Sequence, residues 1–297
     1  MKTNVSHKLL FALCGLALVS VSVTGCGKLE TGAHAEPTVR LKSAEAVVAA
    51  IPGASAEKVE VAGGGEKGGV GSLVGRVTLK GNKPNQTVIF EKGKSTKDGS
   101  VCAADGAILS EELIVGGDGG VANVFVFLDK APAGFKAAKP NDKLDFDQKG
   151  CVFTTHAMVC QVGQLIKVLS DDDLAHNTHT FPGRNDPFNS TIKPKERDGL
   201  DLVYKKSEKN PFPVKCDLHS WMIAYHLPLD HPFAAVSGKD GKFEIKNLPA
   251  GTHEFRVWHE RAEGGKGGFL ERKLKVVIKG GEQPPVEIAV DAAKFGL

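Results

Sequence analysis

Short runs of apolar residues, many of them β-branched or alternating with polar ones, recur along the chain from residue 73 to residue 290. Alternation with a period of two is typical of half-buried strands, and the glycines and prolines between the runs are typical of turns. The pattern predicts strands over 73–80, 86–91, 122–128, 151–155, 163–170, 200–205, 225–230, 233–236, 242–246, 253–258, 271–278 and 285–290, with a hairpin turn at 239–241. We find no internal repeat, and we expect an all-β fold: a Greek-key sandwich with additional strands.

The first 26 residues follow a different pattern. Two lysines within residues 1–8 precede an apolar run over 9–23, which is too short to favour a spanning helix and is typical of a signal peptide. The sequence Val-Thr-Gly-Cys at 23–26 matches the lipobox of bacterial lipoproteins, in which the chain is cut before the cysteine and the thiol is lipidated. We therefore expect Cys26 to anchor the protein to a membrane, with the body on the periplasmic side or at the cell surface. Gly27 follows Cys26 where a sorting aspartate would stand, which favours the outer membrane.

Composition divides the rest of the chain. Residues 1–25 are predicted to be the signal peptide and 26–71 a flexible tether, because the tether ends in a glycine-rich run that packs against nothing. A short helix is expected within it at 43–51. Residues 72–232 are predicted to form the main β domain and 233–297 a C-terminal β extension. The net charge is +3 with acidic and basic residues interspersed, so we expect no nucleic-acid partner.

Four residues in the middle of the chain have the side chains of a copper site. Cys216, His219 and Met222 stand in the spacing C-x2-H-x2-M, and His176 lies 40 positions before the cysteine. A thiolate, two imidazoles and a thioether are the donor set of type 1 copper. The spacing places three donors on one short loop and leaves the fourth to a neighbouring strand. The alternative to His176 is His179, which an odd spacing places on the opposite face of the same strand.

Three of the six cysteines remain after one is assigned to the signal peptide, one to the lipid anchor and one to the metal. In an oxidising compartment two of Cys102, Cys151 and Cys160 are expected to pair. We favour Cys102 with Cys151, leaving Cys160 buried as a small apolar residue on its strand, although the spacing leaves the other pairings open.

Other polar and aromatic residues near the donors have two interpretations each. The acidic run at 171–173 is predicted to be a solvated turn rather than a cation site. Trp221, between two of the donors, is either packed in the core or part of an exposed patch that docks a redox partner; we favour docking. The remaining histidines of the folded part are expected to be structural or on the surface: His156, His226, His231, His253 and His259.

The two donor segments, 175–181 and 216–222, resemble those of cupredoxins, and most closely those of amicyanin and pseudoazurin. The resemblance spans roughly residues 150–230 and implies a cupredoxin-like sandwich. It implies that Asn177 ties the two ligand loops together and that electrons pass through an exposed edge of His219. Leu218 stands where these relatives often have proline. This departure is expected to affect the reduction potential more than the identity of the bound metal. The copper ligands that the resemblance implies are His176, Cys216, His219 and Met222.

The wider chain resembles bacterial lipoproteins labelled methylamine-utilisation-like. The segments that carry this resemblance are 230–233 and 241–260, and the second is also similar to carboxypeptidase-regulatory-like β modules, which are accessory rather than catalytic. Residues 75–84 are also similar to these β modules. We expect these strands to extend the cupredoxin-like sandwich as one elaborated unit.

The sequence therefore predicts a lipid-anchored type 1 copper protein. It would exchange single electrons with a redox partner such as a c-type cytochrome or a dehydrogenase. An enzyme is not expected, because four protein donors leave the copper no open position for a substrate. Two other functions stay open: copper storage or delivery without redox cycling, and a scaffold lipoprotein that has lost its metal.

Overall fold

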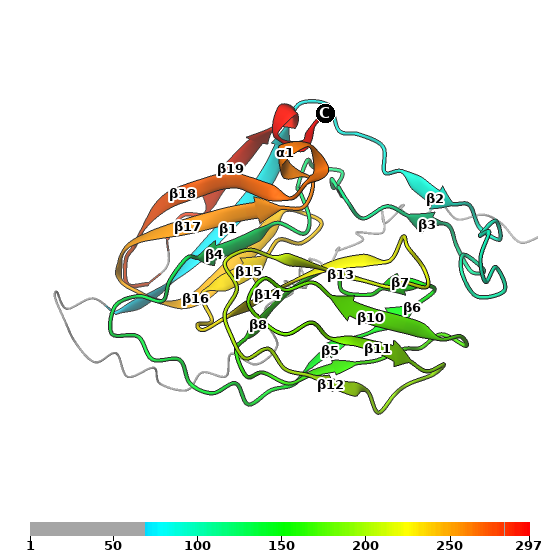
Figure 1. Cartoon of the computed structure of the whole chain (residues 1–297). Helices are drawn as coiled ribbons and strands as arrows, with labels where there is room; N and C mark the ends of the chain where they lie inside the picture. Colours follow the sequence, from blue (N-terminus) through cyan, green and yellow to red (C-terminus); the bar gives the residue numbers. More distant parts are fainter. Residues whose placement is uncertain (1–68, 282) are drawn as a thin grey trace, which may run out of the picture. The chain divides into compact units, whose positions relative to one another are not determined.

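Nearly all regular structure is β-strand in the computed structural model, which describes residues 69–281 and 283–297 (Figure 1). The predicted all-β class is confirmed. The predicted signal peptide, lipid-anchored Cys26, almost all of the tether and the helix at 43–51 lie outside the described residues. Among the described residues, no helix has the length and apolar character needed to cross a membrane.

Two sheets form the sandwich that holds the copper-ligand candidates, and its core contains Phe146, Phe153 and Tyr204. The first sheet has the order β11-β10-β13-β14-β8, formed by β8 (Ala157–Gln161), β10 (His176–Thr180), β11 (Asn189–Ile192), β13 (Phe212–Lys215) and β14 (Ile223–Leu229). The second has the order β12-β9-β5, formed by β5 (Leu144–Phe146), β9 (Ile166–Val168) and β12 (Leu200–Leu202).

A second sandwich combines strands from both ends of the described chain (Figure 1). One sheet has the order β16-β1-β19, formed by β1 (Val70–Lys80), β16 (Lys242–Pro249) and β19 (Val286–Asp291). The other has the order β15-β4-β17-β18, formed by β4 (Phe125–Leu128), β15 (Ala234–Val236), β17 (Gly251–His259) and β18 (Gly268–Ile278). Two short turns complete it: α1 (Ala262–Gly265) and the 3-10 helix η1 (Ala292–Phe295).

This pairing revises the boundary expected at residue 232. Strands β1 and β4 come before that boundary, yet they pair with the C-terminal strands and not with the sheets that hold the ligand candidates. Strands β1 and β4 therefore form one sandwich with the strands of 234–291, and the strands between β4 and β15 form the other. Local pattern identifies strands but does not determine which distant strand each one pairs with.

Strand β4 is buried on both faces and joins the two sandwiches. Val126 and Leu128 pack in the core of the second sandwich, whereas Phe125 and Phe127 point the other way. There the two phenylalanines join a separate apolar cluster with Leu227 and other residues of β8, β14 and β17. Successive residues of a strand face opposite sides, so an uninterrupted apolar run fits a strand covered on both faces.

Two short pairs complete the structure: β2 (Val88–Phe90) with β3 (Ile108–Leu109), and β6 (Gln148–Lys149) with β7 (Val152–Phe153). Residues 91–107, which connect β2 to β3 and are called the cap below, are fastened by a disulfide between Cys102 and Cys151. This is the pairing favoured from the sequence. Cys160, which is unpaired in the structure, is buried in β8.

Candidate metal centre

Strand register brings the two ligand segments to the same end of one sheet. Strands β10 and β13 run antiparallel with His179 opposite Lys215, so the start of β10 lies beside the end of β13. His176 is the first residue of β10, and Cys216 follows the last residue of β13. Residues 40 positions apart in sequence therefore become neighbours.

Three donor atoms face one another at this end of the sheet. The Nδ1 atoms of His176 and His219 are 3.1 Å apart, and the Sγ atom of Cys216 lies 3.9 Å from the first and 3.7 Å from the second. All three residues are buried. A metal that binds nitrogen at about 2.0–2.1 Å and sulfur at about 2.3 Å separates its donors by about 3–4 Å. The arrangement fits a metal held by two imidazoles and a thiolate.

The fourth predicted ligand belongs to the same tight loop. Met222 accepts a backbone hydrogen bond from the Cys216 N–H (3.2 Å) and donates one to the His219 carbonyl (2.9 Å). These bonds fold 216–222 back on itself, and the Met222 side chain is buried in the same core as Cys216. The C-x2-H-x2-M spacing thus forms one closed turn, as the sequence analysis expected.

Hydrogen bonds favour the thiolate form of Cys216. Burial raises the pKa of the thiol, but interactions with His176 and His219 and the Asn177 N–H lower it to about 6. The Asn177 amide donates to the sulfur at 3.4 Å. A thiolate is the form that binds copper, so the surroundings of Cys216 suit metal binding.

Asn177 links the two ligand segments, as the family resemblance implied. Its side-chain oxygen accepts a hydrogen bond from the Asp217 N–H at 2.6 Å, and its side-chain nitrogen donates to the Asp217 carboxylate at 2.8 Å. The Leu218 N–H lies 3.4 Å from the same oxygen. Because position 218 is not proline, it keeps a donor that proline lacks.

Asp172 is a functional candidate that the sequence analysis missed. The prediction that the acidic run is a solvated turn is wrong for Asp172. Its side chain is 4% exposed and accepts a hydrogen bond from His176 Nε2 at 2.8 Å. The backbone N–H groups of Gly150 and Cys151 also donate to it. Burial raises the pKa of this carboxyl, but these hydrogen bonds lower it overall. With Nε2 occupied in this way, Nδ1 of His176 is left to face Cys216.

We expect Asp172→Asn to weaken copper binding about 10- to 100-fold, the usual effect of removing a carboxylate that orients a ligand histidine. The amide keeps the shape but loses the charge that favours the Nε2–H tautomer. Competition titration of Cu(I) against a chelator measures the change. Asp171→Asn is the matched control, because Asp171 pairs with Lys149 at the surface. Equal affinities for Asp172→Asn and the wild type would contradict this role.

The edge of His219 is covered, which corrects the expectation of an exposed ligand. The side chain is 1% exposed, and its Nε2–H donates to Asp98 of the cap at 2.9 Å. The neighbouring Lys97 donates to the carbonyl of Leu218. The sulfur atoms of the disulfide lie within 4.8 Å of a His219 ring nitrogen. The cap, a long connection between two short strands, covers this imidazole.

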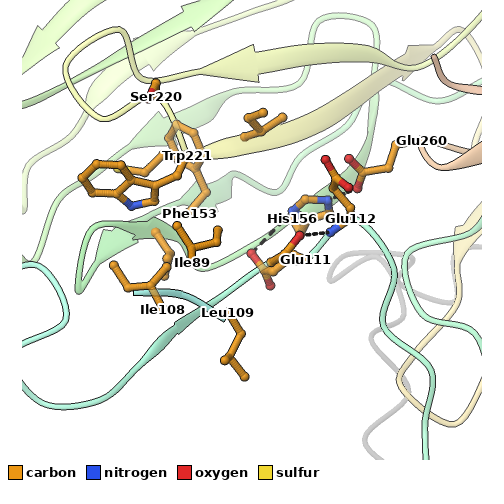
Figure 2. Close-up of a pocket in the computed structure, with 14 residues that line it drawn as sticks. Ile89, Ile108, Leu109, Glu111, Glu112, Phe153, His156, Ser220, Trp221 and Glu260 are labelled. Atoms are coloured by element: carbon orange, nitrogen blue, oxygen red, sulfur yellow. Dashed lines mark hydrogen bonds and ion pairs between the residues drawn. The ribbon is translucent and has the colours of Figure 1, made fainter. Parts of the chain in front are cut away.

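Trp221 is the partly exposed aromatic residue beside the covered histidine. Its ring packs edge-on against His219, with centroids 5.1 Å apart, and against Phe90, with centroids 4.8 Å apart. The indole N–H donates to the Cys151 carbonyl at 2.9 Å. Trp221 is therefore packed on several sides, and it also lines a cavity of about 250 Å³ (Figure 2).

The other histidines are placed apart from the three donors. His179 pairs with Asp217 at 3.0 Å, so of the two histidines in β10 it is His176 that meets Cys216. His226 is fully buried and contacts the Tyr204 hydroxyl at 2.9 Å, and burial lowers its pKa to about 3. His156, His231 and His259 are also buried, and His253 contacts a backbone carbonyl of its own hairpin.

No family model matches the chain, and no curated protein sequence matches it. Among solved structures, amicyanin from Paracoccus versutus is 14% identical over 36% of this chain and 99% of its own, with a TM-score of 0.26. A purple cupredoxin from Nitrosopumilus maritimus is 13% identical over 30% of this chain and 100% of its own, with a TM-score of 0.25. A copper-containing nitrite reductase from Thermus scotoductus is 15% identical, with a TM-score of 0.27. That match covers 33% of this chain and only a quarter of the reductase.

Proposed function

We propose that this chain binds one type 1 copper ion through His176, Cys216, His219 and Met222 and carries single electrons. The observation that supports this is the buried triangle of two Nδ1 atoms and one sulfur, with sides of 3.1, 3.7 and 3.9 Å. Bound copper would supply a one-electron couple tuned by a thiolate and a weak axial thioether.

The residues around the donors hold them in place. Asp172 and Asp98 each accept a hydrogen bond from the outer nitrogen of a donor histidine, and the Asn177 N–H donates to the sulfur. Donors fixed in this way resist rearrangement when the charge of the bound ion changes. Small rearrangement is what fast electron exchange requires. Because four protein donors fill the coordination sphere, we propose a carrier rather than an enzyme.

With the cap closed, electrons would enter or leave through Trp221, and opening of the cap would expose the His219 edge as a second, faster route. The indole ring contacts His219 and is the partly exposed group next to it. A c-type cytochrome or a dehydrogenase docking over Trp221 would reach the site through a ring that contacts His219.

We also propose that the protein works in the cell envelope, lipidated at Cys26 and held at the outer membrane. The lipobox at 23–26 supports the anchor. The disulfide between Cys102 and Cys151 supports an oxidising compartment, because such bonds are rare in reducing cytosol.

A visible spectrum of the mature, lipid-free protein tests the proposal. After addition of one equivalent of Cu(II), we expect an intense thiolate-to-copper charge-transfer band that bleaches on reduction and returns on oxidation. Equilibrium titration with redox mediators should then give a midpoint reduction potential for a reversible one-electron couple. Copper bound in stoichiometric amount without the band would contradict the type 1 assignment.

Copper storage or delivery is a second candidate, favoured by the burial of His219 under the cap. A carrier exchanges electrons quickly with small redox reagents, whereas a store holds copper behind the cap and exchanges electrons slowly. Stopped-flow reduction of the copper-loaded protein separates the two, because fast and repeatable reduction and reoxidation without copper loss excludes storage.

A further inference from the structure

A second group of potential metal donors lies outside the copper centre, at the junction of the two sandwiches. His156 comes just before β8, Glu260 just after β17, and Glu111 just after β3. These residues line the cavity of about 250 Å³, whose wall also includes Trp221 and Met222. Figure 2 shows His156 between the two carboxylates, with Trp221 on the other side of the view.

One ring nitrogen of His156 is held by a buried carboxylate. Nε2 lies in hydrogen-bond contact with Glu260, whose side chain is 7% exposed. The His156 carbonyl also accepts a hydrogen bond from the Tyr225 N–H at 2.7 Å, which fixes the backbone. A histidine that donates Nε2–H to a carboxylate presents Nδ1 as an acceptor, and this is the usual support of a ligand histidine in metal sites.

Within the described part of the chain, the other ring nitrogen has no hydrogen-bond partner although it is buried. Nδ1 of His156 lies 3.4 Å from Glu111 Oε2, without the geometry of a hydrogen bond. The His156 side chain is 6% exposed and that of Glu111 is 34% exposed, so the carboxylate lies between the buried ring and solvent. A separation of about 3.4 Å is what two donors show when each binds one tetrahedral metal ion at about 2.0–2.1 Å.

We propose that His156 Nδ1 and Glu111 bind a divalent first-row metal ion such as Zn²⁺, with water from the cavity completing its coordination. Imidazole and carboxylate suit such ions, and the cavity has room for several water molecules. The site shares no donor residue with the group of His176, Cys216 and His219, and its donors are nitrogen and oxygen without sulfur. Binding would join the segment after β3 to the residue that precedes β8.

The surrounding charges favour a cation. Three carboxylates, those of Glu111, Glu112 and Glu260, line the cavity beside His156. Arg261 offsets part of that charge through its pair with Glu112 at 2.8 Å.

Calorimetric titration with Zn²⁺ tests the site, using protein first saturated with one equivalent of Cu(I) so that the softer donors are occupied. The wild type should bind one equivalent of Zn²⁺, and Glu111→Gln should weaken that binding at least about tenfold. Glu112→Gln is the matched control, because Glu112 pairs with Arg261 and is 57% exposed. His156→Gln gives a second test of the same loss.

Zinc-edge X-ray absorption of the same samples identifies the donors. We expect nitrogen and oxygen neighbours and no sulfur. Sulfur in the zinc shell would show that the ion had entered the Cys216 site, and the proposal would be overturned. Equal Zn²⁺ affinity in the wild type and Glu111→Gln, or equal losses in Glu111→Gln and Glu112→Gln, would overturn it as well. Either result can be told from failure of the copper proposal, because copper loading is measured beforehand.

Discussion

Cys216→Ser should abolish the charge-transfer band of the copper-loaded protein completely while leaving the β fold in place. The band needs a thiolate bonded to Cu(II), and a serine hydroxyl is a harder donor that stays protonated at neutral pH. The variant also loses the sulfur that accepts the Asn177 N–H and faces both Nδ1 atoms. Visible absorption after Cu(II) addition measures the loss, and far-ultraviolet circular dichroism confirms the fold.

Cys160→Ala is the control for this substitution. Cys160 is the other cysteine outside the disulfide in the described part of the chain, and it is buried in β8. Burial strongly raises the pKa of its thiol, in contrast to that of Cys216. We expect Cys160→Ala to keep the band and lose some stability from the small cavity. A band that survives in Cys216→Ser would rule out Cys216 as the copper thiolate.

The donor set could be predicted from sequence because its chemistry is local. Cys216, His219 and Met222 fall within seven positions, and their residue types and spacing are informative without any knowledge of pairing. His176 was identified by its neighbour Asn177 and by the facing rule of a strand. Asp172 and Asp98 were missed because their roles depend on where chain segments meet. A carboxylate that is buried against an imidazole looks, in sequence, like one in a solvated turn.

The fold shows the same division between local and distant information. Many predicted strands correspond to observed ones, such as β1, β15 and β16, because apolar alternation is a local property. The pairing of β1 with β16 and β19 joins residues more than 160 positions apart, and no local pattern encodes it. Strand β11 (Asn189–Ile192) was also missed, since its residues are mostly polar and it is an outer strand of its sheet.

The cap explains why the edge of His219 is covered although the family resemblance implies an exposed one. The resemblance covers residues 150–230, whereas the cap comes from residues 91–107, outside the matched region. Its turn places Asp98 at a positive φ of 49°, a backbone conformation that aspartate tolerates better than most residues. That turn directs the carboxylate at His219. A segment outside the resemblance therefore changes the surroundings of a residue inside it.

The double substitution Cys102→Ser and Cys151→Ser should lower the free energy of unfolding and speed electron exchange. The disulfide spans 49 positions, and closing a loop of that length contributes about 4 kcal/mol in the chain-entropy account. Without it, the cap is held over the metal ligands by weaker contacts, chiefly Asp98 with His219 and Lys97 with Leu218. Local opening then becomes accessible at a lower free energy than global unfolding.

Denaturant unfolding of the copper-free protein measures the stability loss, and stopped-flow reduction of the copper-loaded protein measures the rate of electron entry. Asp98→Ala separates the two effects, because it removes the hydrogen bond to His219 and leaves the disulfide intact. If His219 is a gated route, both variants should be reduced faster than the wild type, and only the double variant should lose about 4 kcal/mol. A destabilised double variant whose reduction rate stays unchanged would mean that electrons never needed the covered edge. Trp221 would then remain as the route, because its ring contacts His219 and is partly exposed with the cap closed.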